Sequence, residues 1–149
     1  MKTRYAAMIV EPISTLWENF GGKNGRGGSG TYNHAWSGGP LTMLSQYTAG
    51  LVPTSPGWKT FEVKPQPGPL TRIDAIVPTP HGDVSLTLCR ERKRLRMELT
   101  VPHGTQATIE VPAPKVGAWK RVRLNEDDVT PNRLIEVPEG KQIIVTEQD

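Results

Sequence analysis

Polar and apolar residues alternate along most of the chain that follows Trp58. In residues 83–91, for example, Val84, Leu86 and Leu88 alternate with Ser85 and Thr87. Successive side chains of a strand point to opposite faces, so this alternation predicts strands with one buried face. Strands are predicted in the segments 58–65, 70–78, 83–91, 94–102, 105–112 and 119–124, and as a closing pair in 133–147 around the turn "PEGK". About eight short strands separated by turn residues predict a mainly β fold, an antiparallel β-sandwich preceded by a short helical segment.

The first 56 residues have a different pattern. Residues 4–10 predict about two helical turns that end before Pro12. A second helix is predicted to begin at Pro40 and to end at Gly50, a residue that suits a helix C-terminus. Its shared face is predicted to carry Leu41, Leu44, Thr48 and Leu51. The change of pattern predicts two regions, residues 1–56 and a sandwich domain of residues 57–149.

Charge and cysteine content narrow the classes of function. The 18 basic and 15 acidic residues leave a net charge of +3, and the basic clusters 89–96 and 119–123 interleave with apolar residues. We interpret them as the solvent faces of strands and predict no nucleic-acid partner, because RNA-binding signatures are absent. The single cysteine, Cys89, excludes an internal disulfide framework and a multi-cysteine metal site, and its strand predicts a buried, inert thiol.

No cofactor, metal ion or membrane partner is predicted. No window approaches 18 consecutive apolar residues, so no spanning helix is expected. The N-terminal apolar run is interrupted by Glu11 and Pro12 and is not interpreted as a signal peptide, which leaves the compartment unknown. The loop "GRGGSG" at 25–30 matches G-x-G-x-x-G, but no strand–helix–strand pattern surrounds it. We therefore expect a mobile loop there, not a dinucleotide site.

Candidate chemistry gathers on both sides of this loop. Trp17 and Glu18 precede it, and "YNHAW" follows it with Asn33, His34 and Trp36. Aromatic faces stack on the C–H surfaces of sugars, Asn and His form hydrogen bonds with hydroxyls, and a carboxylate can act as a general base for water. The alternative is that Glu18 is an ordinary solvated glutamate and His34 merely caps a loop. The residue types alone leave both interpretations open.

The motifs support a resemblance to a known family. "TLWENF" at 15–20, "SGTYNHAWSGGPLTMLSQYTAGLVPTSPGWKTFEVKPQPGPL" at 29–70 and "PTPHGDVSLTL" at 78–88 resemble the C-terminal part of family 78 α-L-rhamnosidases. In that family an (α/α)₆ barrel carries the active site and a C-terminal β-sandwich packs against it. The resemblance implies that residues 1–56 are the end of such a barrel, and that residues 57–149 are the sandwich.

The resemblance also implies roles for individual residues. The family inverts the anomeric carbon with two carboxyl groups, one of which activates water. Glu18 matches the family's general base, and His34 matches the histidine that contacts rhamnose. Trp17, Trp36 and Asn33 are expected to line the same pocket. The general acid of the family lies upstream of the matched segment, so the chain is expected to be inactive alone.

Two kinds of partner follow from this interpretation. A rhamnose-containing glycan or glycoside is the expected ligand, and the missing barrel or a second copy would cover residues 1–52. The apolar side chains expected to be exposed there are Tyr5, Ile9, Ile13, Leu16, Trp17, Leu44 and Leu51. The alternative function is a non-catalytic β-sandwich module with a carbohydrate-binding or structural role.

Overall fold

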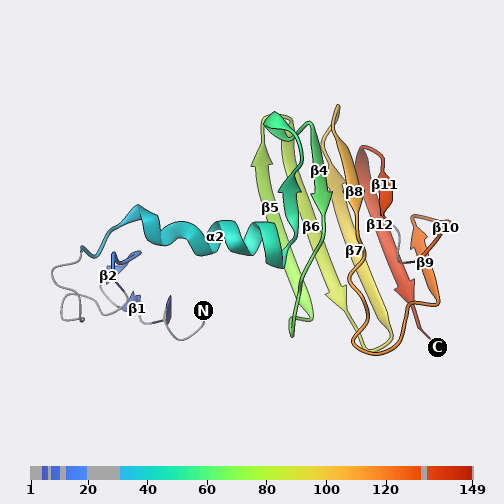
Figure 1. Cartoon of the computed structure of the whole chain (residues 1–149), viewed down its shortest axis with the longest axis horizontal. Coiled ribbons are helices and arrows are strands. Elements are labelled where there is room, and N and C mark those ends of the chain that lie inside the picture. The colour runs from blue at the N-terminus through green and yellow to red at the C-terminus, as the bar shows by residue number, and fades with distance from the viewer. Residues whose placement is uncertain (1–4, 7, 11–12, 20–30, 132–133, 149) are drawn as a thin grey trace. The chain divides into compact units, whose positions relative to one another are not determined.

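The fold is described from a computed structural model of the 149-residue chain. The structure describes residues 5–6, 8–10, 13–19, 31–131 and 134–148. It divides into two compact units, Met1–Thr42 and Met43–Asp149, which are described separately below (Figure 1). The loop at 25–30 and the residues Glu11 and Pro12 lie outside the described residues.

The N-terminal unit holds a small sheet and the start of a helix. β1 (Ile9–Val10) pairs antiparallel with β2 (Ile13–Ser14). Tyr5 and Ala6 are helical, but β1 follows them, so the predicted helix over 4–10 is wrong in its second half.

A helical stretch of residues 35–48 begins five residues before the predicted start at Pro40. It consists of a 3₁₀ turn (Ala35–Gly38), α2 (Gly39–Met43) and a π-helical turn (Leu44–Thr48). Gly50 follows with φ +71°, the left-handed conformation that a terminating glycine adopts readily. Leu51 does not continue the helical face, because it lies in β3 and is fully buried.

The second unit contains two sheets. The four-stranded sheet has the order β11-β8-β4-β3, and the six-stranded sheet has the order β10-β9-β12-β7-β6-β5. The strands are β3 (Leu51–Pro53), β4 (Thr60–Val63), β5 (Arg72–Thr79), β6 (Gly82–Arg90), β7 (Arg94–Val101), β8 (Gln106–Ile109), β9 (Arg121–Leu124), β10 (Asp127–Val129), β11 (Ile135–Val137) and β12 (Gly140–Glu147). The predicted mainly β fold is confirmed, and β3 and β10 are short strands that the sequence pattern did not indicate.

Nearly all neighbouring strands are antiparallel, as in a sandwich built from hairpins and longer returns. β5, β6 and β7 form a meander, and β12 returns along β7 with Gly140 opposite Val101. The exception is β4 and β8, which pair in parallel with Phe61 opposite Ala107. A parallel pair requires a long crossover, and here the hairpins of the other sheet supply it.

The core lies between the inner faces of the two sheets. The predicted inward positions of β6 and β7 are confirmed, since each of their side chains is at most 1% exposed. They are Val84, Leu86 and Leu88 of β6 and Leu95, Met97, Leu99 and Val101 of β7. They face a second row from the smaller sheet, to which Phe61, Val63 and Ile109 belong. This continuous apolar cluster is the main source of stability for the sandwich.

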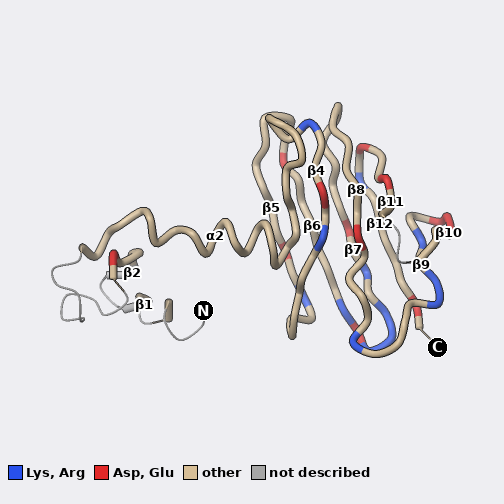
Figure 2. The backbone as a smooth tube through the Cα atoms, in the orientation of Figure 1, with Lys and Arg blue, Asp and Glu red and all other residues tan. Residues whose placement is uncertain are grey.

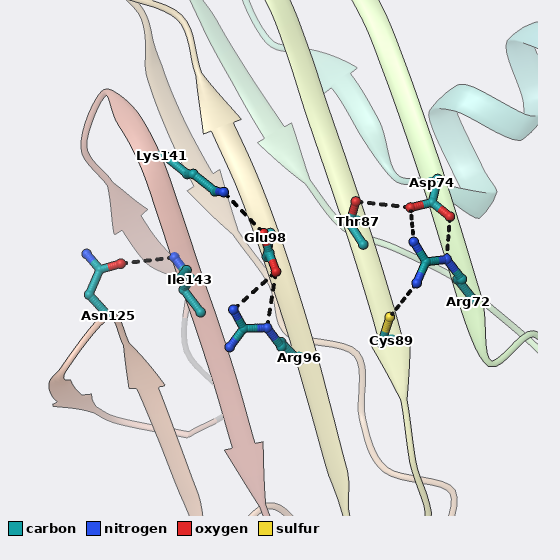
Figure 3. Close-up of polar contacts among 9 residues, drawn as sticks. All are labelled: Arg72, Asp74, Thr87, Cys89, Arg96, Glu98, Asn125, Lys141 and Ile143. Carbon is teal, nitrogen blue, oxygen red and sulfur yellow. Dashed lines mark hydrogen bonds and ion pairs between the residues drawn. The ribbon is translucent and has the colours of Figure 1, made fainter.

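Cys89 corrects one expectation. It was predicted to be buried, but it is only half-buried and accepts a hydrogen bond from Nη1 of Arg72 at 3.4 Å. Cys89 alternates with Leu88, so it falls on the outer face of the six-stranded sheet. Figure 3 shows the polar contacts of this face, including the two bonds that Arg72 donates to Asp74 at 2.6 and 2.8 Å. The hydrogen bonds from Arg72 lower the pKa of Asp74.

Candidate functional site

Two segments of the N-terminal unit are held side by side by backbone hydrogen bonds. The amide of His34 donates to the carbonyl of Leu16 at 2.8 Å, and the amide of Glu18 donates to the carbonyl of Thr31 at 2.9 Å. These bonds join residues on both sides of the glycine-rich stretch. Glu18 and His34 are therefore brought together although sixteen positions separate them in the sequence.

Side chains reinforce the same junction. The hydroxyl of Thr15 donates to the carbonyl of Tyr32, and the hydroxyl of Ser37 donates to the carbonyl of Trp17. Each of these bonds satisfies a backbone carbonyl that regular secondary structure does not pair. Polar contacts, and not a large apolar core, thus hold the segment around Glu18 against the segment around His34.

Glu18, Thr31 and His34 form the polar centre of the site. Oε2 of Glu18 lies 3.8 Å from Nδ1 of His34 and accepts a hydrogen bond from the amide of Thr31 at 2.9 Å. The hydroxyl of Thr31 is 3.2 Å from Nδ1 of the same histidine. The side chain of Glu18 is 25% exposed and that of His34 is 36% exposed, so both groups are reachable from solvent.

His34 precedes the helical stretch without capping it through its side chain. It occupies the position before Ala35, yet its side chain makes no capping hydrogen bond. The ring instead contacts the indole of Trp36, with ring centroids 4.5 Å apart and planes inclined by 47°. His34 is therefore oriented by Thr31, Glu18 and Trp36.

The two tryptophans have different surroundings. Trp36 is 68% exposed, and its indole N–H donates to the carbonyl of Glu18 at 3.3 Å. Trp17 is half-buried against Tyr32 in an edge-to-face contact at 5.2 Å. The indole nitrogen of Trp17 is buried and has no hydrogen-bond partner among the described residues. Trp36 is thus largely open to solvent, whereas Trp17 packs against Tyr32.

A cavity of about 440 Å³ adjoins these residues within the same unit. Asn33 and His34 line it, whereas Glu18, Trp17 and Trp36 do not. The full lining consists of Tyr5, Met8, Thr15, Leu16, Asn33, His34 and Ala35. The structure therefore joins Glu18 to His34, and joins His34 and Asn33 to a cavity.

Sequence reasoning missed Thr31 and Ser37. Both are small hydroxyl residues at the edge of a motif chosen for its aromatic and charged members. The spacing of Thr31 and His34, three residues apart, was the one available signal. Nothing in the sequence pattern indicated that the amide of Thr31 would bind a carboxylate thirteen residues away.

The described residues include neither a cluster of potential metal-ligating side chains nor a membrane-spanning helix. No group of three or more His, Cys, Asp or Glu side chains there could hold a metal ion. Within the same residues, no helix has the length and apolar character needed to cross a membrane.

These features define a class of protein, a two-sheet β-sandwich domain preceded by a short polar and aromatic site. The family model "Bacterial alpha-L-rhamnosidase C-terminal domain" matches residues 50–125, about half of the chain. The chain belongs to this family of C-terminal domains, and the predicted resemblance is confirmed. An alpha-L-rhamnosidase of Formosa agariphila is 29% identical over 110 residues, which cover 70% of this chain and 12% of that protein.

Solved structures agree on the fold. The alpha-L-rhamnosidase of Dictyoglumus thermophilum superposes with a TM-score of 0.82 at 23% identity, covering 99% of this chain and 18% of that one. The Streptomyces avermitilis alpha-L-rhamnosidase complexed with L-rhamnose gives 0.72 at 22% identity, covering 89% and 14%. The Aspergillus terreus enzyme gives 0.68 at 21%, also covering 89% and 14%. The chain thus spans less than a fifth of each of these proteins.

Proposed function

We propose that this chain is the C-terminal portion of an α-L-rhamnosidase-like inverting glycoside hydrolase. Residues 1–56 would be the end of its helical catalytic barrel, with β3 contributed to the sandwich. The observation that carries this proposal is the 3.8 Å separation of Glu18 Oε2 and His34 Nδ1 beside a cavity that His34 lines. Family membership supports the same substrate class, a rhamnose-containing glycan or glycoside.

Glu18 is proposed as the general base. Its Oε2 is held by the amide of Thr31, and among the described residues no hydrogen bond reaches Oε1. A carboxylate with one fixed and one open oxygen can accept a proton from a water molecule as that water attacks an anomeric carbon. His34 and Asn33 would form hydrogen bonds with sugar hydroxyls in the cavity that they line. Trp17 and Trp36, which do not line that cavity, would limit the sugar pocket on the side of Glu18.

An inverting reaction also needs an acid on the opposite side of the glycosidic bond. In this proposal that acid belongs to barrel residues outside this chain. Loss of general acid catalysis lowers the rate by about 10²- to 10⁴-fold, and loss of most of the sugar subsite lowers it further. The chain alone should therefore not hydrolyse rhamnosides at a useful rate.

The test is hydrolysis of an aryl α-L-rhamnoside by the purified chain, with Glu18→Gln as the matched variant. We expect no turnover above that of the buffer for either protein. Turnover by the native chain that disappears in Glu18→Gln would contradict the proposed dependence on an external acid. Titration with L-rhamnose, with His34→Ala as control, tests the sugar subsite separately from the chemistry.

A partner surface is also proposed for the N-terminal region. Trp36 and Leu41 are 68% and 72% exposed, and Leu16 is 40% exposed. Within the second unit, Leu44 and Tyr47 are about half exposed. Exposed apolar groups of this size favour burial against a partner, so we propose that the missing barrel or a second copy covers them. Sedimentation velocity over a range of concentrations tests self-association, and a concentration-independent monomer would contradict it.

Three members of the expected apolar set are either buried or lie outside the described residues. Leu51 is fully buried in β3 and cannot belong to an exposed patch. The side chains of Ile9 and Ile13 lie outside the described residues.

The second candidate function, a non-catalytic module, is supported by the sandwich itself. The apolar cluster between its two sheets draws its members from the second unit alone. A sandwich of this kind can serve as a wall or a glycan-binding domain without the N-terminal site. Rhamnose binding that survives His34→Ala but is lost in Trp119→Ala would favour this function over the first.

A further inference from the structure

A larger cavity, of about 720 Å³, lies at the end of the sandwich where β6 finishes and β7 begins. Segments far apart in the sequence build its walls. The backbone amide of Gln148 donates to the carbonyl of Lys93 at 3.0 Å, and its side-chain amide donates to the carbonyl of Val116 at 2.7 Å. These bonds cross-link the β6–β7 turn, the segment before β9 and the end of β12. The cavity is therefore part of the folded sandwich and does not depend on one loose loop.

The side chains of this cavity are strongly cationic. Among its described lining residues Glu91 is the one carboxylate, and five cationic side chains accompany it. Figure 2 shows Lys and Arg gathered at this end of the sandwich. The cations are Arg90, Arg92, Lys93, Lys115 and Lys120.

These charges differ from the cations on the outer sheet face. There, Arg72, Arg96 and Arg121 each form an ion pair with a carboxylate at 3.1 Å or less. In the described part of the chain, no ion pair joins Arg90, Arg92, Lys93 or Lys115 to a carboxylate. Cations that outnumber the carboxylates around them raise the local positive potential, which attracts an anion. The inference rests on these four cations.

Arg90 provides a second and independent indication. Its Nε is buried and has no hydrogen-bond partner among the described residues. Among the described residues, the one acceptor of its guanidinium is the carbonyl of Ala113, 3.5 Å from Nη2. Buried donors are nearly always satisfied in folded proteins, so Nε is a donor without an acceptor among the described residues, on a side chain that lines the cavity.

The cavity lining also contains apolar side chains, those of Pro114, Val116 and Trp119. Trp119 is 5% exposed, and its indole N–H donates to the carbonyl of Pro112 at 2.9 Å. A sugar ring with an acidic substituent has matching surfaces, because it combines a C–H face with an anionic group. Nucleic acid fits less well, since a buried Trp119 offers no open face on which a base could stack. A membrane surface fits less well, because the cationic groups line a concave cavity.

We propose that this cavity binds the anionic group, a carboxylate or a sulfate, of an acidic oligosaccharide. The guanidinium of Arg90 and the charges of Arg92, Lys93 and Lys115 bind the anion, while Pro114 and Val116 contact the ring. This site lies wholly in the second unit and does not depend on the proposed roles of Glu18 and His34.

Isothermal titration calorimetry of the full chain at low ionic strength tests the proposal. The probes are a short uronic-acid oligosaccharide, a sulfated one and a neutral one of equal length. We expect saturable binding of one or both acidic probes, no binding of the neutral probe, and weaker binding as salt screens the charges. The two acidic probes distinguish a carboxylate from a sulfate.

Matched variants locate the site. Arg92→Gln with Lys93→Gln should weaken binding about tenfold or more, because two charges near the anion are lost. Lys115→Gln should weaken it by a smaller factor. Lys59→Gln with Lys141→Gln removes the same net charge elsewhere on the sandwich and should leave binding within about twofold of the native chain. Unchanged unfolding midpoints check that the variants fold.

Three results would overturn the proposal. The first is the absence of saturable binding to both acidic probes. The second is equal weakening by the two double variants, which would mean that only net charge matters. The third is equally tight binding of a single-stranded oligonucleotide or of anionic phospholipid vesicles, which would indicate a general polyanion surface.

Discussion

Different kinds of interaction stabilise the interior of each of the two units. In the N-terminal unit, Met8 is the single buried hydrophobic side chain among the described residues, and every other one belongs to the sandwich unit. The N-terminal unit is joined by hydrogen bonds around Glu18, Thr31 and His34. The sandwich has a continuous apolar core. Apolar burial is the dominant stabilising term in folding, so we expect the sandwich to fold independently and the site to depend on it or on a partner.

The largest expected effect on stability comes from a substitution at Gly50, the residue directly before β3. A side chain at Gly50 would place its Cβ 2.1 Å from the backbone carbon of Lys64, and the φ of +71° already disfavours any other residue. Gly50→Ala should therefore lower the free energy of unfolding of the sandwich by more than about 4 kcal/mol. Urea denaturation measures this change.

Gly57→Ala is the matched control for that experiment. Gly57 has a similar φ of +68°, but a Cβ there would meet nothing within 4 Å. Its cost should be about 1 kcal/mol, the price of the left-handed conformation alone. Equal losses for both variants would show that the close approach of Gly50 to Lys64 does not constrain the fold.

The next largest expected effect is the loss of stability when a buried leucine, as opposed to an exposed one, is replaced by alanine. Leu88 is fully buried, whereas Leu41 is 72% exposed. Leu88→Ala should lower the free energy of unfolding by about 3 kcal/mol, through lost burial and the cavity left behind. Leu41→Ala should change it by less than about 0.5 kcal/mol. A large loss for Leu41→Ala would mean that the helical stretch belongs to the cooperative core.

The smallest expected effect concerns pH. Hydrogen bonds from Arg96 and then Lys141 lower the pKa of Glu98. A carboxyl group whose pKa is lower in the folded state stabilises the fold above its unfolded pKa of about 4, and that contribution disappears as the pH falls through the folded pKa. The free energy of unfolding should therefore decrease as the pH falls from about 5 to about 2. The decrease should be slightly smaller in Glu98→Gln than in the native chain.

Glu136→Gln serves as the control for the pH series, because Glu136 is a solvent-exposed glutamate on strand β11. Chemical denaturation at each pH provides the measurement. An identical pH dependence for the native chain and Glu98→Gln would show that the contacts of Glu98 do not affect stability.

The sequence predicted the sandwich well because its signal is repeated. Val84, Leu86 and Leu88 and the corresponding residues of β7 alternate without interruption, and one buried face requires that alternation. The short strand β3 was missed, since three residues show no period. The predicted burial of Cys89 is wrong because it follows from the apolar neighbours of Cys89. The alternation itself puts Cys89 on the face opposite to Leu88.

The candidate site could be predicted only in part. Glu18 and His34 were selected by residue type and by family resemblance, but their 3.8 Å contact depends on backbone pairing across the glycine-rich stretch. The role of Thr31 follows from that pairing and has no signature of its own. The sequence pattern did not indicate the cationic cavity. Its cluster 89–96 is interpreted as the solvent face of strands, whereas Arg92 and Lys93 lie in the turn between β6 and β7, and Lys115 belongs to neither basic cluster.

One measurement tests the central claim most directly. A chimera would replace the matching C-terminal portion of the Dictyoglumus thermophilum alpha-L-rhamnosidase with this chain, and its kcat would be compared with that of the Glu18→Gln chimera. We predict an active chimera whose kcat falls by about 10²- to 10⁴-fold in the variant, the usual loss when a general base is removed. An active chimera with unchanged kcat in Glu18→Gln would contradict the assignment of Glu18 as the base.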